Sequence, residues 1–308
     1  MTLLNTILEK IEIEVDEPQA VAKSLKSKEL QFVAGVYSKN VNDILGLLAL
    51  PYFFVSVGID NALRTQFFLQ AVAETKILLK SKEDKAKVQA YAKRLAKQAK
   101  EDQNSPQYPS KETNRQLASL LENEKVSEAV RSLLFAGVSA GWAAFESAAK
   151  DTWVVALNSR PKLLAQPAFA KLDDTAADGL NAKHVSVGLL ARHGFDLRDK
   201  LGLLLSDKFD FTGVAGIRTA YTSAFGKSSS FDTMFNEQNL ATLEATRHLI
   251  VHRAGFVDED YKRRTKDIIP LGHQLHIDGA RVCELVNSSI TICCKMIRHV
   301  DDWLDKNQ

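Results

Sequence analysis

Apolar residues recur at helical spacing along most of the chain, and alternating apolar and polar positions are rare. Between residues 124 and 158 they follow i, i+3 and i+4 spacing. Arg160-Pro161 ends this segment, because a residue before proline disfavours the helical conformation. Similar patterns predict helices at residues 183–205, 212–225, 237–254 and 279–305, the last with Asp278 as its N-cap. The alternation at residues 273–277 is too brief for a sheet, so the pattern predicts an all-α protein.

The longest apolar run, residues 44–59, lies in the N-terminal part of the chain between two aspartates. Gly46, Pro51 and Gly58 interrupt it, and a membrane-spanning helix needs roughly 20 consecutive apolar residues. We therefore expect a buried pair of short helices here and no membrane span. A further helix is predicted at residues 61–80.

A polar segment with two prolines and no periodicity, residues 101–110, separates two blocks of helical pattern. We interpret this segment as part of a linker. The sequence thus predicts a helical N-terminal domain at residues 1–103, a linker at residues 104–115 and an α-helical bundle at residues 116–308.

The net charge of the whole chain is only +2, so it does not indicate a nucleic-acid or membrane partner. Local charge is more pronounced, since residues 76–100 contain nine Lys or Arg against two acids, a net charge of +7. Tyr91 is the only aromatic residue in this stretch, which favours a solvated helix face over a groove that binds nucleic acid.

The three cysteines, Cys283, Cys293 and Cys294, fall on the last helical pattern and form no C-x-x-C pair. An odd number of cysteines on one apolar pattern is typical of buried, reduced thiols in a reducing compartment. The N-terminus shows no basic region followed by a signal-type apolar core. These features predict a cytoplasmic protein.

Residues 237–255 carry the candidate chemistry. At about 100° per residue, five apolar residues align as one stripe along this helix: Leu240, Leu243, Ile250, Val251 and Ala254. Arg247 projects from the middle of the stripe, where an arginine must be paired, reach out to water or point into a shared cleft. His248 and His252, four residues apart, lie together on the flank of the stripe. Gly255 suits the position that follows the helix end.

This arrangement has three interpretations. In the structural one, a carboxylate holds a buried arginine and the histidines are ordinary surface residues. In the second, the histidines bind zinc, although no glutamate follows the first histidine as in metalloproteases and no cysteine is nearby. In the third, Arg247 holds a phosphodiester while a histidine moves protons.

The run Arg247-His248-Leu249-Ile250-Val251-His252-Arg253-Ala254-Gly255 closely resembles the signature of HEPN domains. That signature is an arginine, a polar residue (commonly Asn, Asp or His), a few further residues and then a histidine, on one helix of an α-bundle. The surroundings are similar too, with a long helix containing residues 142–151 upstream and residues 257–261 and 272–277 downstream. The layout resembles RiboL-PSP-type and related HEPN families over roughly residues 116–308. Residues 1–103 show no such resemblance.

The resemblance implies a metal-independent endoribonuclease of the defence or toxin type that needs no cofactor. Catalytic HEPN proteins commonly form homodimers whose motif helices face each other, and an arginine on an apolar stripe fits burial against a second subunit. RNA carries its own nucleophile, the 2′-hydroxyl, so the expected products are 2′,3′-cyclic phosphate and 5′-hydroxyl ends. His252 lies in the last helical turn, where the macrodipole favours a cation, which suits a general acid. His248 is expected to orient the phosphate or His252, and Arg247 to stabilise the transition state.

Four cations that follow the motif are candidates for steering RNA: Arg253, Lys262, Arg263 and Arg264. Charge alone fits a solvated helix end equally well. Glu146 and Asp151 are expected to pair with Arg247 and to order the site without cutting. Two other functions stay open, a non-catalytic HEPN module that binds RNA or a protein and a purely structural dimer. An antitoxin or other regulatory protein is a further expected partner.

Overall fold

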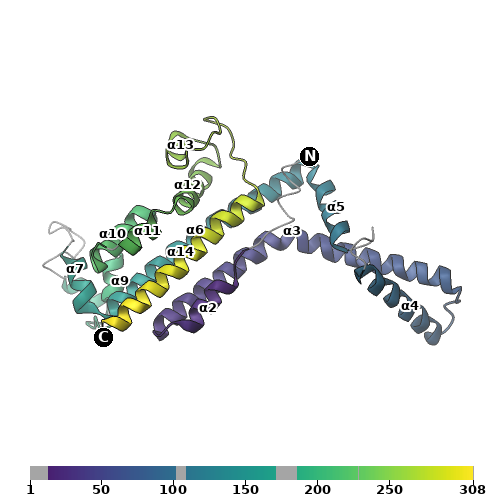
Figure 1. Cartoon of the computed structure of the whole chain (residues 1–308), viewed down its shortest axis with the longest axis horizontal. Helices are drawn as coiled ribbons and strands as arrows, with labels where there is room; N and C mark the ends of the chain where they lie inside the picture. Colours follow the sequence, from purple (N-terminus) through teal and green to yellow (C-terminus); the bar gives the residue numbers. More distant parts are fainter. Residues whose placement is uncertain (1–12, 102–108, 171–185, 228, 308) are drawn as a thin grey trace. The chain divides into compact units, whose positions relative to one another are not determined.

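The computed structural model describes residues 13–101, 109–170, 186–227 and 229–307. Every regular element in these ranges is helical (Figure 1), and their one β-type pairing is an isolated antiparallel bridge between Phe256 and Gln274. The all-α prediction is confirmed, and residues 273–277 form no strand. The elements are α2 (Asp16–Ser24), α3 (Lys28–Thr75), α4 (Lys82–Glu101), α5 (Pro109–Leu121), α6 (Glu124–Ser159), the π-helical turn η1 (Pro161–Ala165), α7 (Gln166–Phe169), α8 (Val187–Arg192), α9 (Leu201–Ser206), α10 (Val214–Phe225), α11 (Ser229–Phe235), α12 (Gln238–Arg253), α13 (Glu259–Thr265) and α14 (Gly279–Lys306).

The chain folds as two compact units. The first contains Gly46–Leu134 and Asp278–Ala280, and the second contains Glu12–Leu45, Phe135–Ile277 and Arg281–Gln308. The long helices α3 and α6 each contribute residues to both units.

These units differ from the predicted domains at several places. Residues 116–134 and 278–280, predicted in the C-terminal bundle, group with the first unit. Residues 12–45 group with the C-terminal part of the chain, because the backbone N–H groups of Lys26 and Ser27 donate to the Asp301 carboxylate of α14 at 2.8 and 2.9 Å. The described end of the predicted linker is helical, since α5 begins at Pro109 and proline suits the first turn of a helix. The rest of the linker, residues 102–108, lies outside the described residues.

The first unit is built on a hairpin of α3 and α4. After α3 ends at Thr75, Lys76 adopts a left-handed conformation with φ of 53°, and α4 begins at Lys82. The helix predicted at residues 61–80 therefore ends early. Apolar residues of both helices form the core of the hairpin: Leu63, Phe67, Ala71, Val88, Ala92 and Ala99. The Tyr91 hydroxyl donates to Glu74 Oε2 at 2.7 Å across it.

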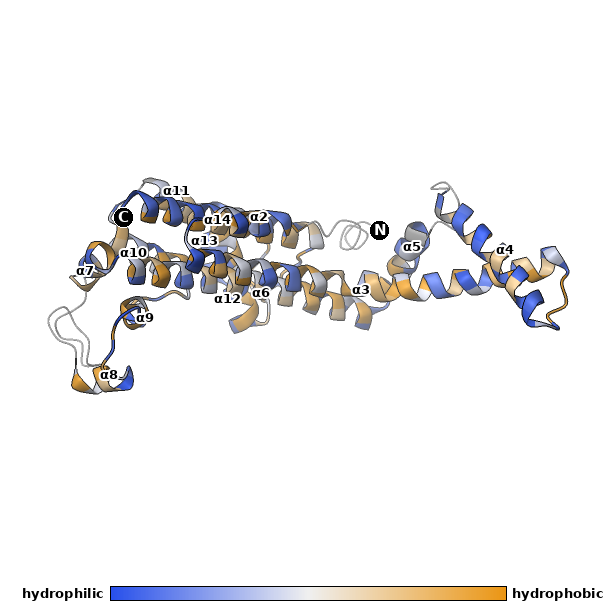
Figure 2. Cartoon of the chain, turned by 90° about the horizontal axis from the view of Figure 1, so that it is seen from below, coloured by the Kyte–Doolittle hydropathy of each residue, from blue (hydrophilic) through white to orange (hydrophobic). Residues whose placement is uncertain are grey.

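The expected buried helix pair at residues 44–59 is wrong. α3 continues through Pro51 for 48 residues, and only Ile44 and Leu48 are buried between residues 44 and 61. An interior proline removes one backbone hydrogen bond, but the strong helix formers at residues 47–50 continue the helix up to it. Figure 2 shows the hydrophobic middle of α3. By length and composition it is the one helix in the described ranges that could cross a membrane.

Helix α14 forms the centre of the second unit. α6 runs parallel to it, and Arg160 Nε at the end of α6 donates to the Asn307 carbonyl oxygen at 2.7 Å. A side chain at Gly141 would lie 2.9 Å from Val286 Cγ2, so glycine lets the two helices approach closely. In Figure 1, α2 and the start of α3 lie on one side of α6 and α14, and α10 to α12 lie on the other.

Two buried aromatic residues fix α10 against α6. The Trp153 indole N–H donates to the Ala220 carbonyl oxygen at 2.9 Å, and the Tyr221 hydroxyl donates to the Ala149 carbonyl oxygen at 2.9 Å. Both rings are fully buried, and these bonds avoid the cost of an unpaired polar group in the core. They place α10 where it supports α12.

Four helices agree with their predicted bounds to within two residues: α6, α10, α12 and α14. The segment predicted as one helix at residues 183–205 is broken. Its described part holds α8 and α9, separated by a turn in which Gly194, Phe195 and Asp199 have positive φ, and residues 183–185 lie outside the described residues. The three cysteines are free and buried on α14, as predicted.

Candidate functional site

The Arg-x4-His motif lies in the second half of α12. The buried residues of this helix are Leu240, Thr242, Leu243, Ala245, Thr246 and Leu249. The predicted apolar stripe is therefore wrong for its C-terminal half, where Val251 is 53% exposed and Ala254 is also exposed. Threonine counts as polar in a sequence pattern, but the Thr246 hydroxyl donates to the Thr242 carbonyl oxygen at 2.7 Å. Its side chain is thus buried with the hydroxyl satisfied.

The motif side chains occupy the exposed side of this half of the helix. At about 100° per residue, Arg247, Val251, His248 and His252 succeed one another over roughly 140° of the circumference. We call this surface the motif arc. Both histidines are exposed, and their ring centroids lie 4.5 Å apart, which confirms the predicted proximity. Arg247 is partly exposed at one edge of the arc.

Two left-handed residues end α12. Ala254 with φ of 50° and Gly255 with φ of 80° both donate their backbone N–H groups to the Leu249 carbonyl oxygen. The sequence indicated only the glycine. Backbone hydrogen bonds then pair residues 255–257 with residues 272–275, and this pairing holds the end of the helix that carries the histidines.

Glu146 of α6 lies close enough to Arg247 for their charges to interact. Burial raises the pKa of the Glu146 carboxyl, while the Arg247 guanidinium favours the charged form and opposes that rise. The buried Trp142 indole N–H also favours the charged form, although it has no acceptor in hydrogen-bonding geometry among the described residues. No carboxylate oxygen of the described residues lies within 4 Å of Arg247. The expected association is thus electrostatic, without a direct ion pair.

Asp151, the other acid expected to pair with Arg247, lies elsewhere. Burial raises the pKa of its carboxyl, and the charge that opposes this rise is that of Lys150. The Asp151 charge also helps to raise the pKa of Tyr221 on α10, after the larger effect of burial. Asp151 follows Glu146 by five residues, which places the two side chains about 140° apart around the helix. The two acids therefore face different partners.

Three of the four cations expected to steer RNA are paired with carboxylates: Arg253 with Asp258, Arg263 with Asp260, and Arg264 with both Glu244 and Asp260. For Lys262, no carboxylate of the described ranges lies within 4 Å. The pairing of Asp260 with Arg263 and Arg264 could be predicted from the sequence, because residues three and four apart are neighbours on a helix. The geometry fits a largely neutralised helix end better than a basic patch.

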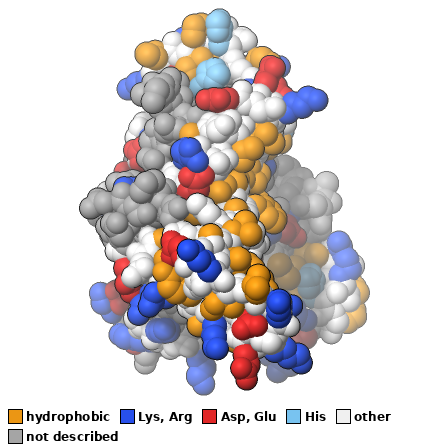
Figure 3. All heavy atoms as spheres, turned by 90° about the vertical axis from the view of Figure 1, so that its right-hand side faces the viewer, with side chains coloured by type: hydrophobic (Ala, Val, Ile, Leu, Met, Phe, Trp, Pro, Cys, Tyr) orange, Lys and Arg blue, Asp and Glu red, His pale blue; other side chains and the backbone are white. Residues whose placement is uncertain are grey.

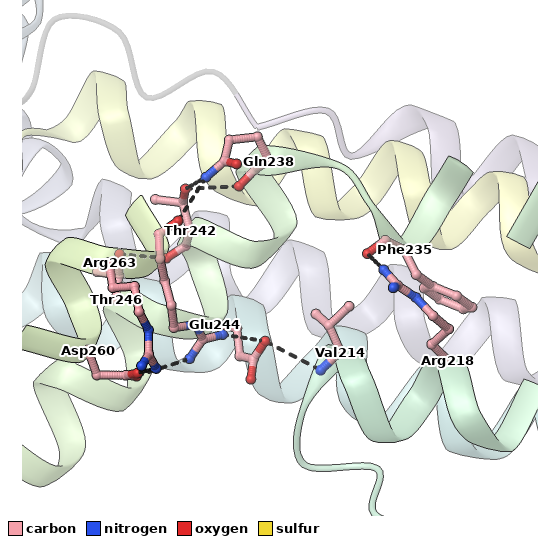
Figure 4. Close-up of polar contacts among 10 residues, drawn as sticks. Val214, Arg218, Phe235, Gln238, Thr242, Glu244, Thr246, Asp260 and Arg263 are labelled. Atoms are coloured by element: carbon pink, nitrogen blue, oxygen red, sulfur yellow. Dashed lines mark hydrogen bonds and ion pairs between the residues drawn. The ribbon is translucent and has the colours of Figure 1, made fainter. Parts of the chain in front are cut away.

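Glu244 links three helices. Its Oε2 lies 2.7 Å from Arg264 Nη2 of α13 and accepts a hydrogen bond at 3.4 Å from the Val214 backbone N–H at the start of α10 (Figure 4). Asp258 caps α13 by accepting from the Tyr261 backbone N–H at 2.9 Å. Neither α13 nor a role for Glu244 was predicted from the sequence, because no local pattern marks that residue.

The described ranges hold no group of three or more His, Cys, Asp or Glu side chains that could bind a metal ion. An apolar groove of about 730 Å³ lies in the first unit, between α3 and α4, and none of the motif residues lines it. In Figure 3 hydrophobic side chains lie exposed between Lys and Arg side chains. The chemistry at the motif arc is therefore that of two histidines, an arginine and a nearby carboxylate.

No protein-family model, no curated protein and no solved structure matches this chain.

Proposed function

We propose that this protein is a metal-independent, cytoplasmic endoribonuclease of the HEPN type, acting in defence or as a toxin, with Arg247 and His252 as its catalytic residues. The motif arc carries the proposal. On this one exposed surface lie two adjacent histidines and an arginine with no direct ion pair among the described residues. Proton transfer and stabilisation of a charged phosphorane need these two kinds of side chain.

The geometry of the helix favours a site shared by two copies. Arg247 and His252 lie about 140° apart around α12, so within one chain they diverge and converge poorly on a single phosphodiester. A two-fold axis beside the motif arc brings the arginine of one copy toward the histidine of the other. Val251 and Phe256, 53% and 48% exposed, offer apolar surface for such a homodimer.

In the proposed reaction, one histidine takes the proton of the RNA 2′-hydroxyl, whose oxygen then bonds to phosphorus. The bond from phosphorus to the 5′-oxygen breaks, and His252 gives that oxygen a proton. Arg247 stabilises the negative charge that develops on the phosphate oxygens. His248 orients the phosphate or His252. The products carry a 2′,3′-cyclic phosphate and a 5′-hydroxyl, and no redox partner or metal ion enters the balance.

The surroundings of the arc set the expected mode of binding. Because Arg253, Arg263 and Arg264 are paired with carboxylates, Lys262 is the remaining predicted cation for attracting phosphates, and RNA affinity should depend only mildly on salt. Glu146 acts as a positioning residue through its charge on Arg247. A protein that silences the enzyme, such as an antitoxin, has to cover the same arc.

The test is RNA cleavage by the purified full chain and three variants. His252→Ala should lower the rate by roughly 10²–10⁴-fold, because it removes proton transfer at an exposed position. Arg247→Lys keeps the charge but loses the planar fork, so a bidentate phosphate contact should suffer. His276→Ala, which removes an exposed histidine outside α12, is the matched control and should cut at the wild-type rate.

Circular dichroism establishes that each variant is folded, and light scattering gives its mass. If folded His252→Ala cuts at the wild-type rate, the nuclease assignment is wrong, and a non-catalytic module that binds RNA or a protein takes its place. A monomer that retains full activity excludes the shared site.

A further inference from the structure

One face of α3 is apolar and uncovered among the described residues. Leu50, Phe53, Phe54 and Val57 follow i, i+3, i+4 and i+7 spacing and are 44%, 67%, 70% and 47% exposed. We call these four residues the α3 stripe. No residue of α3 from 49 to 62 is buried, and the hydrophobic colouring of this part of the helix is visible in Figure 2. Contiguous apolar surface of this kind marks a place of contact.

The spacing of the stripe points to another helix as its partner. Side chains at i, i+3, i+4 and i+7 form the ridge by which one helix packs against another. Gly46 and Gly58 flank the stripe, and added side chains there would meet nothing within 4 Å. A second helix can therefore approach the α3 backbone closely at both ends of the stripe.

Exposed charges at the two ends decide the orientation. Asp43 and Arg64 lie within about 40° of Leu50 around the helix. Each has an ion pair at 2.7 Å within α3, Asp43 with Lys39 and Arg64 with Asp60, but their side chains stay 64% and 72% exposed and can meet a second copy. Two parallel copies of α3 would set each of these charges against its like. Two antiparallel copies, crossing between Phe53 and Phe54, set Asp43 of one copy opposite Arg64 of the other.

We propose that α3 pairs antiparallel with α3 of a second copy of this chain through the α3 stripe, with Leu50 opposite Val57 and Asp43 opposite Arg64. This isologous contact repeats each pairing twice about its axis. It uses a different helix from the motif arc, and it does not depend on the nuclease function.

A lipid bilayer fits the same segment less well. The apolar run at residues 44–59 spans about 24 Å as a helix, against roughly 30 Å of hydrocarbon core. Aspartates stand at both of its ends. Its most exposed large side chains also gather on one stripe, whereas a spanning helix is apolar all round.

Charge reversal tests the pairing in the full chain. Asp43→Arg and Arg64→Asp each place like charges opposite each other at both ends of the contact, so light scattering should show each variant at half the wild-type mass. An equal mixture of the two variants should recover the wild-type mass, because each reversed charge then meets its complement. Lys87→Glu, an exposed charge reversal on α4 outside the stripe, should leave the mass unchanged.

Cysteine cross-linking tests the register. Leu50→Cys and Val57→Cys chains should form a disulfide under mild oxidation when they are mixed, and neither should cross-link by itself. The native cysteines are buried and should not compete. Self-cross-linking of Leu50→Cys would mean parallel pairing and would overturn the proposal.

Two other outcomes overturn it. One is a wild-type mass that neither charge reversal changes, with no cross-link in the mixture. The other is a monomeric chain that floats with vesicles of phosphatidylcholine and phosphatidylglycerol, which would assign the stripe to lipid. Neither outcome bears on RNA cleavage, so this proposal and the nuclease assignment fail separately.

Discussion

Replacing Gly255 with alanine tests how the end of the motif helix is held. The residue has φ of 80°, and a Cβ atom there would lie 2.8 Å from Cε2 and 2.9 Å from Cζ of Phe135 on α6. The left-handed conformation costs an alanine about 1–2 kcal/mol relative to glycine. Forcing the Phe135 ring aside adds about 1–3 kcal/mol of overpacking. The free energy of unfolding should therefore fall by about 2–5 kcal/mol.

Gly272→Ala supplies the matched control. Gly272 has φ of 74°, but an added Cβ would meet nothing within 4 Å, so this variant should show the conformational cost alone. Urea unfolding followed by tryptophan fluorescence reports on the second unit, because Trp142, Trp153 and Trp303 all belong to it. The excess cost of Gly255→Ala over Gly272→Ala measures the contact with the Phe135 ring.

A double-mutant cycle isolates that contact. In a Phe135→Leu background the smaller side chain leaves room for a Cβ, so the excess cost of Gly255→Ala should largely disappear. If both glycine variants lose the same stability in the wild-type background, the ring does not press on Gly255. The account of how α12 is anchored to α6 would then be wrong.

Three further predictions concern the metal, the thiols and pH. Cleavage of RNA should continue in EDTA, because the proposed mechanism uses only side chains and the 2′-hydroxyl. If EDTA abolishes cleavage and a divalent ion restores it, the two histidines are metal ligands and the proposed mechanism is wrong. Burial raises the pKa of the Cys294 thiol to about 12 and holds the pKa of Cys293 well above its ordinary value. Ellman's reagent should therefore label the native chain slowly and all three cysteines in denaturant. Fast labelling of the native chain would contradict the burial of the cysteines. Burial lowers the pKa of His299 from its ordinary value of 6.5, with Asp302 opposing, so neutral His299 contributes stability that is present above about pH 6.5 and lost as the pH falls. His299→Gln should flatten that fall in urea titrations, and an unchanged slope would show that His299 titrates alike in the folded and unfolded chains.

Local pattern was sufficient for much of the fold. The bounds of α6, α10, α12 and α14 follow from apolar periodicity and helix-ending residues, since both act within a few residues of the chain. The proximity of His248 and His252 follows in the same way from four residues of helix. The burial of the cysteines on α14 was visible in their shared apolar pattern.

Tertiary contacts decided the rest. Which side of α12 is buried depends on Thr242 and Thr246, whose polarity hid them from the pattern. Residues 12–45 join the second unit through contacts with α14 that cross more than 270 positions of sequence. The shorter of the two ion pairs of Arg264 is with Glu244, twenty residues away on another helix. Separations of this size leave no periodic trace, because the energy of a contact depends on distance in space and not along the chain.

The apolar run of α3 also shows what a sequence pattern leaves undecided. The sequence by itself determined that residues 44–59 are apolar and lie between aspartates, and hydrophobicity normally implies burial. Only the tertiary structure decided that α3 runs unbroken through Pro51 and that its stripe stays uncovered among the described residues. Periodicity specifies which side chains share a face of a helix. Whether that face is covered depends on the packing of the rest of the chain or of a second copy against it.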